Sequence, residues 1–353
     1  MLMLWELLLR GVAVLAGVAL VVVVVSAAIR SFVLPRNESV LVSNYVFRFV
    51  RVVFDVVASR AQTYAQRDRV LSIYAPVALI ALPVVWLGLL SVAYTCIFWG
   101  LGEGSWERCY LISNNALLTI GAEEPTHGLV ASSASFSEAL LGLLLLTLLI
   151  SYLPTIYQAF SRRELVVARL ELRAGAPASA TNLITWLNRS GSLLDDEDQW
   201  QRWEEWFVEI EESHTSLPII SFFRSPQPGR SWVTSAGIIL DTAALIFSTV
   251  DQPRSSNAEL CFKAGCIAMN RVYRFFQNRA HSQPSGLVAT GNPLEEPSRR
   301  DFEHAYDQLQ EAGVPVVANR AEAWQHYHEL RSRYEQAVVF LAKLTVAPEV
   351  KPV

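Results

Sequence analysis

Three apolar runs constrain this chain more than any other feature of its sequence. They cover residues 2–25, 73–99 and 136–160, and charged side chains are rare within them. A helix needs about 20 consecutive apolar residues to cross the hydrocarbon core of a bilayer. Because the backbone finds no water to hydrogen-bond there, it must be helical or form a closed barrel. The chain is therefore predicted to be an all-α membrane protein with three transmembrane helices.

The composition divides the chain into a membrane half and a half that resembles a soluble protein. Its 353 residues are 52% hydrophobic and 18% charged, too apolar for a typical soluble protein and too charged for one that lies wholly within a membrane. Residues 164–353 are numerous enough for one further domain, which their periodicity predicts to be all-α. The net charge of -4 does not favour a nucleic-acid partner.

The distribution of arginine predicts how the chain lies in the membrane. The loop between the second and third runs carries mainly acids, whereas the segment after the first run is rich in arginine: Arg30, Arg36, Arg48, Arg51, Arg60, Arg67 and Arg69. Basic segments stay on the cytoplasmic side. We therefore expect a multi-pass protein of the cell membrane (plasma or inner membrane), with its N-terminus outside and its C-terminal domain in the cytoplasm.

The first run is expected to be a retained transmembrane helix within residues 1–34. The alternative is a cleaved signal peptide, because small residues end the run in V-S-A-A. The run is longer than that of a signal peptide, and no basic residue precedes it, which disfavours cleavage. Residues 35–72 then form a basic amphipathic connector. It lies either in the inner membrane interface or in the cytoplasm, packed against its neighbours, and its pattern fits both.

The segment between the second and third runs reads S-N-N-A-L-L-T-I-G-A-E-E-P over residues 113–125. Non-helical backbone persists at membrane depth only where it is buried or lines a water-filled cavity, so this segment is interpreted as a re-entrant loop. The carbonyls of Thr119, Ile120 and Gly121 would then replace the hydration shell of a cation. Asn114 and Asn115 either brace the loop or tie its helix to neighbours. The alternative is an extracellular loop in which Thr-Ile-Gly occurs by chance.

This segment resembles the pore loop of the tetrameric potassium-channel superfamily, including the spacing of Ser113 six residues before Thr119. The resemblance covers Ile73 to Arg163 and implies a pore domain over residues 73–163. Within it, the family pattern implies an outer helix over 73–100, a pore helix and filter over 105–125, and an inner helix over 134–161. One pore loop in each chain implies a homotetramer that surrounds the ion path.

The residues after Thr-Ile-Gly differ from those of potassium-selective members. Those members continue with an aromatic residue, a second glycine and an aspartate, whereas Ala122, Glu123 and Glu124 follow here. An acid and a proline after the tripeptide make the loop similar to the T-I-G-E-T-P filter of cyclic-nucleotide-gated channels, which are poorly selective. The resemblance therefore implies a channel for potassium, with other monovalent cations as further candidates. A ring of Glu123 and Glu124 at the mouth would attract cations.

Four residues of the third run are candidates for gating or for facing the pore. Gly142 and Pro154 are candidate gate positions, because a proline removes a backbone hydrogen bond and a glycine tolerates bending. The alternatives are close helix packing at Gly142 and a helix end at Pro154. Thr147 and Ser151 are four residues apart and are candidates for facing the pore, or else their hydroxyls bond to their own helix.

Residues 164–353 are expected to form a helical cytoplasmic domain. The apolar run at residues 233–250 is interpreted as a buried core helix rather than a fourth span, because Asp241 lies at its centre. A flexible stretch is expected near residues 281–297, where proline, glycine and polar residues gather. Two closing helices are predicted, over residues 299–312 and 321–344.

The sequence contains no motif that predicts catalysis. It has no G-x-G-x-x-G phosphate loop, no nucleophile motif and no metal-ligand spacing. We expect no enzyme activity, no bound metal and no cofactor apart from potassium or another monovalent cation as the transported ion. The expected partners are the lipid bilayer and an unidentified cytoplasmic ligand or protein. The alternative function is a non-conducting, membrane-anchored sensor or scaffold built on a channel-like architecture.

Overall fold

The computed structural model describes residues 2–32, 41–61, 63–126, 128–193, 197–227, 229–253, 255–281 and 299–348. All regular elements within these residues are helices, apart from one isolated β-bridge between Val250 and Val316. Four of these helices are long and apolar enough to cross a membrane. The all-α class is therefore confirmed for this part of the chain, and its long apolar helices are consistent with a multi-pass membrane protein.

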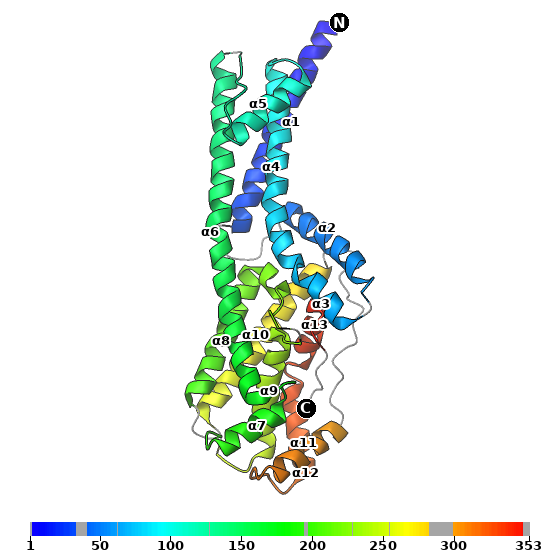
Figure 1. Cartoon of the computed structure of the whole chain (residues 1–353), viewed down its shortest axis with the longest axis vertical. Helices are drawn as coiled ribbons and strands as arrows, with labels where there is room; N and C mark the ends of the chain where they lie inside the picture. The colour runs from blue at the N-terminus through cyan, green and yellow to red at the C-terminus, as the bar shows by residue number, and fades with distance from the viewer. Residues whose placement is uncertain are drawn as a thin grey trace. The chain divides into compact units, whose positions relative to one another are not determined.

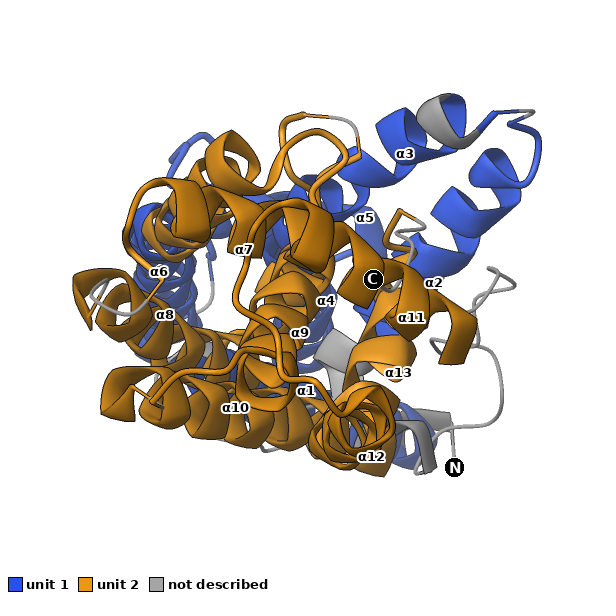
Figure 2. Cartoon of the chain, turned by 90° about the horizontal axis from the view of Figure 1, so that it is seen from below, with its two compact units in different colours: residues 1–157 blue, residues 158–353 orange. Residues whose placement is uncertain are grey.

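The chain divides into two compact units, Met1–Tyr157 and Gln158–Val353 (Figure 2). The division lies close to the predicted boundary between the pore domain and the cytoplasmic domain, at residues 163 and 164. Both positions fall inside one helix, α6 (Gly128–Ala174). This helix begins before and ends well after the inner helix predicted over 134–161, so the two units are connected by continuous helix.

Unit 1, residues 1–157, is built on the long helices α1 (Leu2–Phe32), α4 (Tyr74–Leu101) and the first part of α6 (Figure 1). α1 packs along α4. A methyl group on Gly17 would lie well under 3.0 Å from the carbonyl oxygen of Ala93, and one on Gly100 would meet the backbone of α1 as closely. Small residues allow such close crossings of membrane helices. α1 is therefore a tightly packed member of unit 1.

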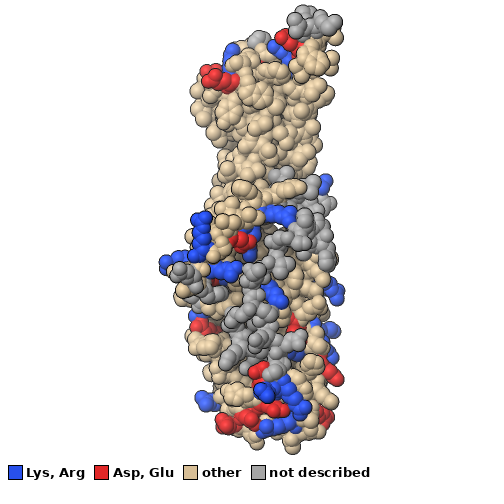
Figure 3. Space-filling model, turned by 90° about the vertical axis from the view of Figure 1, so that its right-hand side faces the viewer, with Lys and Arg blue, Asp and Glu red and all other residues tan. Residues whose placement is uncertain are grey.

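The long helices of unit 1 expose many apolar side chains. Figure 3 shows a band of their surface that is almost free of Lys, Arg, Asp and Glu, below the charged residues at the tip. Large exposed apolar residues occur on all three helices and include Leu7, Leu15, Val22, Val84, Leu140 and Ile150. Contiguous apolar surface of this kind marks contact with lipid or with another protein. The surface is consistent with a helix bundle that spans a membrane.

The basic connector is folded as α2 (Leu41–Ala58) and α3 (Tyr64–Ser72). One side of α2 packs against α4 and buries Val46 and Val50. The other side is an exposed apolar stripe, formed by Tyr45, Phe49, Val52, Val53, Val56 and Val57. A helix that is apolar on both sides favours the interfacial interpretation of the connector, because the bilayer would cover the exposed stripe.

Unit 2, residues 158–353, is a bundle of helices around α9 (Trp232–Thr249), which is buried along almost its whole length. The helices that pack against α9 are α7 (Ala180–Arg189), α10 (Ser256–His281), α12 (Arg320–Arg331) and α13 (Glu335–Thr345). The other elements described after α6 are α8 (Glu197–Ser216), the short 3-10 helix η1 (Pro218–Phe222) and α11 (Arg299–Glu311). The burial of α9 agrees with its interpretation as a core helix.

Asp241 gives the core of unit 2 a buried charge with partners on α12 and in the turn that follows it. It forms an ion pair with Arg331 of α12 and accepts a hydrogen bond of 2.6 Å from the hydroxyl of Tyr334. A buried carboxylate is costly unless such partners surround it. The acid that argued against a fourth span is therefore an internal contact of the bundle.

One expectation for unit 2 is wrong. The closing helix predicted over residues 321–344 is two helices, α12 and α13, separated by a turn. Asn270 donates a hydrogen bond of 2.7 Å to the carbonyl of Arg333, and the Tyr334 side chain turns inward to Asp241. A side chain of α10 thus binds the backbone carbonyl of Arg333, and a side chain of α9 binds the hydroxyl of Tyr334, so both helices hold the turn in place. The stretch expected to be flexible, 281–297, lies outside the described residues except for His281, which ends α10.

Candidate pore loop

The residues predicted to form a pore helix lie in a helix, α5 (Trp106–Leu117), which follows α4 and precedes α6 in the chain. Gly102, with a φ of 90°, ends α4, a conformation that favours glycine. Ser105 caps α5 by accepting a hydrogen bond of 3.3 Å from the N–H of Arg108, as serine commonly does at a helix start. Two local signals in the sequence thus define where α4 ends and α5 begins.

A buried polar network joins α5 to both neighbouring helices. Ser113 Oγ lies 3.0 Å from the carbonyl oxygen of Ser91 on α4 and 2.5 Å from Oε1 of Glu138 on α6. Ser113 and Glu138 are fully buried, and within the part of the chain that the structure describes Oε2 of Glu138 has no hydrogen-bond partner. Acids inside membrane spans are costly, and those that occur often serve function. Glu138 is not among the predicted site residues, although a lone acid in an apolar run is a visible signal.

Gly142 brings α6 against the carboxyl end of α5. A methyl group on Gly142 would lie well under 3.0 Å from the carbonyl oxygen of Leu117. The residue therefore has the close-packing role that is the alternative to a gate. Because Leu117 is the last residue of α5, this contact also determines where the loop after the helix starts.

The six predicted ion-path residues, Thr119 to Glu124, form one exposed loop directly after α5. Thr119 and Gly121 have positive φ values of 54° and 72°, and a left-handed conformation is uncommon for threonine. Asn115 holds the loop in this shape: its carbonyl accepts from the N–H of Ile120 (2.8 Å), and its Oδ1 accepts from the N–H of Ala122 (3.1 Å). Asn115 thus braces the loop, whereas Asn114 bonds back to its own helix.

These hydrogen bonds determine where the loop carbonyls point. In a trans peptide the carbonyl of one residue points opposite to the N–H of the next. The N–H groups of Ile120 and Ala122 point toward Asn115, so the carbonyls of Thr119 and Gly121 point away from α5. No hydrogen bond of the described residues uses either carbonyl as acceptor. The loop therefore presents two carbonyl oxygens outward, and neither has a partner among the described residues.

A second contact anchors the far end of the loop. Glu103, fully buried before α5, accepts hydrogen bonds from the N–H and the hydroxyl of Thr126, at 2.7 Å and 3.0 Å. Glu123 and Glu124 lie between the two anchors with exposed side chains. Glu123 and Glu124, the two acids that the sequence predicts at the mouth, thus lie on the surface. The acid that shapes the loop, Glu103, is buried.

The remaining predicted site residues lie along α6. Pro154 does not end the helix, which continues to Ala174. Ser151 donates a hydrogen bond of 3.0 Å to the carbonyl of Leu148, its own helix backbone, which is the alternative to facing the pore. Thr147 is exposed. The structure therefore brings Glu138 and Gly142 against α5, which the loop follows, but leaves Thr147, Ser151 and Pro154 on the exposed surface of α6.

α6 is held firmly where it enters unit 2. Arg163 is almost fully buried and donates hydrogen bonds to the carbonyls of Ile220 (2.9 Å) and Phe223 (2.7 Å), which belong to η1 and its C-terminal cap. It also pairs with Glu164 at 2.7 Å. One α6 side chain thus satisfies two carbonyls of a short helix more than fifty residues away in the chain. The contact links α6 to the core of unit 2.

Among the described residues, no three His, Cys, Asp or Glu side chains form a group that could hold a metal ion. No protein-family model matches the chain, and no curated protein and no solved structure is significantly similar to it. Arguments about function therefore rest on the geometry of the loop and on the resemblance of its sequence.

Proposed function

We propose that the chain is one subunit of a homotetrameric channel that conducts potassium and other monovalent cations through the loop at residues 118–126. The observation that carries the proposal is the pair of outward carbonyls, those of Thr119 and Gly121, on a loop braced at both ends. Carbonyl oxygens replace the hydration shell of a cation when several chains present them to one axis. The braced conformation means that little ordering is required when an ion binds.

The residues that follow Gly121 support weak discrimination between cations. Glu123 stands where potassium-selective pores have a second glycine, and a residue with a Cβ restricts the backbone conformations that a deep carbonyl stack requires. Exposed Glu123 and Glu124 would instead form a ring of negative charge at the mouth. Such a ring attracts cations in general. The helical domain would gate or assemble the channel through α6, to which Arg163 couples it.

The first test is cation flux through the purified full-length chain in liposomes, comparing potassium, sodium and a large organic cation. Gly121→Ala should remove most of the flux, because alanine is strained at a φ of 72° and nothing else crowds that position. Gly128→Ala is the matched control: its φ is 75°, its surroundings are equally open, and it lies outside the loop. Equal flux in the two variants would contradict the proposed path.

The acidic ring has its own signature in the same assay. Replacing Glu123 and Glu124 by glutamine should lower flux several-fold at about 10 mM salt, where the Debye length is roughly 30 Å, and hardly at all at about 1 M, where it is roughly 3 Å. Glu107→Gln, on the exposed face of α5, controls for loss of an acid nearby. Absence of any flux from wild type, with the protein folded, would instead favour a non-conducting sensor or scaffold.

A further inference from the structure

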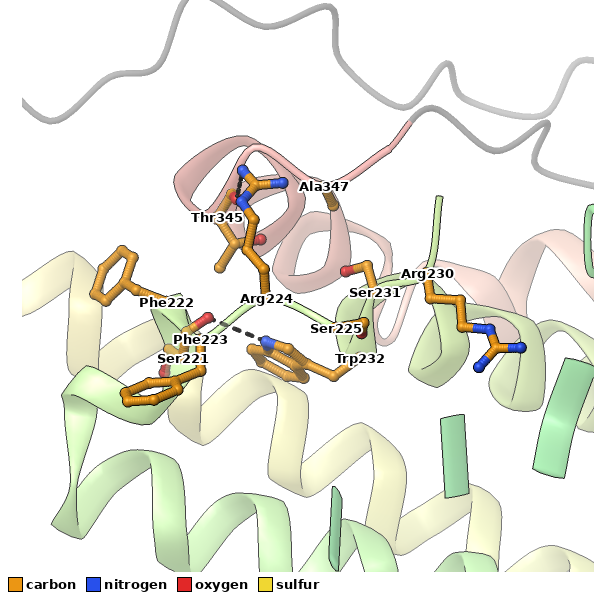
Figure 4. A pocket seen from close by; sticks show the side chains of 10 residues that line it. All are labelled: Ser221, Phe222, Phe223, Arg224, Ser225, Arg230, Ser231, Trp232, Thr345 and Ala347. Carbon is orange, nitrogen blue, oxygen red and sulfur yellow. Dashed lines mark hydrogen bonds between the residues drawn. The ribbon is translucent and has the colours of Figure 1, made fainter. Parts of the chain in front are cut away.

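Unit 2 contains a pocket to which the loop at residues 118–126 contributes no residue. Its wall is formed by residues 221–225, which follow η1, by residues 230–232 at the start of α9, and by Thr345 and Ala347 after α13 (Figure 4). About 270 Å³ of empty space lies between these residues, part of it open to solvent. The pocket thus joins two neighbouring segments to a third that lies more than a hundred residues further along the chain.

The amino end of α9 forms one wall of the pocket. Ser231 occupies the cap position, but its side chain makes no capping hydrogen bond. The first N–H groups of a helix have no partners within the helix, and the helix dipole adds partial positive charge there. Because α9 is buried along its length, its dipole is poorly screened by water. This end of α9 therefore favours an anion.

Hydroxyl groups without partners line the same pocket. Ser221 is 1% exposed and Ser225 is 8% exposed, and the Oγ atom of each has no hydrogen-bond partner among the described residues. Buried hydroxyls normally find a partner, since an unsatisfied one is costly. Both residues line the pocket, and an acceptor atom of a bound ligand would supply the partner that each hydroxyl lacks. Together with Ser231, these side chains supply three donors that lack an acceptor in the described residues.

Arginine completes the set of donors. Arg224 points over the pocket toward α13, where its guanidinium donates hydrogen bonds to the carbonyls of Thr345 (2.8 Å) and Val346 (3.0 Å) (Figure 4). Those bonds fix a positive charge beside the pocket. Arg230 also lines it, but its guanidinium turns away and pairs with Glu171 of α6. The pocket itself has no acidic side chain in its wall.

We propose that this pocket binds a phosphate group, either free phosphate or the phosphate of a small monoester. A phosphate offers several acceptor oxygens in a tetrahedron and a negative charge, which suits hydroxyls, helix N–H groups and the positive charge of Arg224 beside the pocket. A chloride ion would use only one point of such an arrangement. Phe222, Phe223 and Trp232, also in the wall, offer apolar contacts to the organic part of a monoester.

The position of the pocket connects it to α6. Its wall includes Phe223, whose carbonyl accepts a hydrogen bond from Arg163, and Trp232, whose ring lies 5.9 Å from that guanidinium. A bound phosphate would stiffen the segment that holds Arg163. Regulation of ion flux by this route rests on the proposed channel function, whereas binding of the phosphate does not.

The test is a calorimetric titration of the full-length chain in detergent with inorganic phosphate and, separately, with phenyl phosphate, at constant ionic strength. We expect saturable binding with a Kd below about 1 mM and an increase in the thermal unfolding temperature at saturation. The probe that binds more tightly identifies free phosphate or a monoester as the natural class. Absence of saturable binding for both probes would overturn the proposal.

Ser225→Ala is the decisive variant, because its hydroxyl has no partner in the empty pocket. Removing that group should leave the unliganded protein as stable as wild type or slightly more stable, while phosphate binding weakens about tenfold or more, as expected when a hydrogen bond to a charged group is lost. Ser332→Ala, on the exposed end of α12, should bind as wild type does. Unchanged affinity in Ser225→Ala and in Ser231→Ala would place binding elsewhere and refute the site. Neither result depends on ion flux.

Discussion

At the scale of single residues, His214 shows how burial controls a titratable group in unit 2. Its side chain is fully buried. Its Nδ1 lies 3.0 Å from the carbonyl oxygen of Ile210, and its Nε2 lies 3.5 Å from the guanidinium of Arg163. Burial, and then the charge of Arg163, hold the pKa of His214 well below its usual value of 6.5. The geometry suits a neutral ring that donates through Nδ1 and accepts through Nε2.

This depressed pKa predicts a loss of stability in mild acid. The unfolded chain takes up the proton near pH 6.5, whereas the folded chain does not, so the contribution of His214 is complete above that pH and decreases below it. From pH 7.5 to 5.5 the loss should be about 1.4 kcal/mol for this one residue. Urea unfolding of the full chain, followed by tryptophan fluorescence at several pH values, measures it.

The comparison that isolates this effect uses two histidine variants. His214→Gln should unfold with a weaker pH dependence than wild type, even if it is less stable overall. His304→Gln, on the exposed face of α11, should keep the wild-type dependence. The same slope for His214→Gln and wild type between pH 7.5 and 5.5 would show that His214 is not the group responsible.

At the scale of elements, Gly142 predicts how tightly α5 must pack on α6. Gly142→Ala should push α6 away from the carbonyl of Leu117, and overpacking of this kind typically costs about 1–3 kcal/mol. Gly88→Ala, on α4, is the matched control because nothing lies within 4 Å of its added methyl group. Alanine is also the better helix former, so this control should be unchanged or slightly stabilised.

Thermal unfolding in detergent distinguishes the two glycine variants. The Gly142→Ala protein should unfold several degrees below Gly88→Ala and conduct less, because the loop begins at the displaced end of α5. If the two variants are equally stable and equally active, the close approach at Gly142 does not position the loop.

The helices also show which local patterns suffice for prediction. α4 and α5 begin and end near the predicted residues, because apolar length, Gly102 and Ser105 act within a few residues of the chain. The division between α12 and α13 was not predictable, since it depends on Asn270 and Asp241, which lie on other helices. Periodicity describes the residues of one helix and carries no information about which distant group will interrupt it.

At the scale of the whole molecule, the outward carbonyls predict a specific assembly. A single chain exposes the loop at residues 119–124, and an ion path of carbonyls needs several copies around one axis. We expect the purified protein to have the mass of four chains, measured by native mass spectrometry after removal of detergent. A mass of one or two chains under conditions where flux is observed would contradict the proposed architecture.

The sequence by itself determined the class of the protein, the long apolar helices and the place of the loop, because each depends on the length of an apolar run and on residues next to one another. Only the tertiary structure decided which groups shape the loop and which groups line the phosphate pocket. Glu138 meets Ser113, Glu103 meets Thr126, and the residues before α9 meet Thr345 through contacts between segments far apart in the chain. Such contacts follow from how helices pack, and packing depends on all their side chains together.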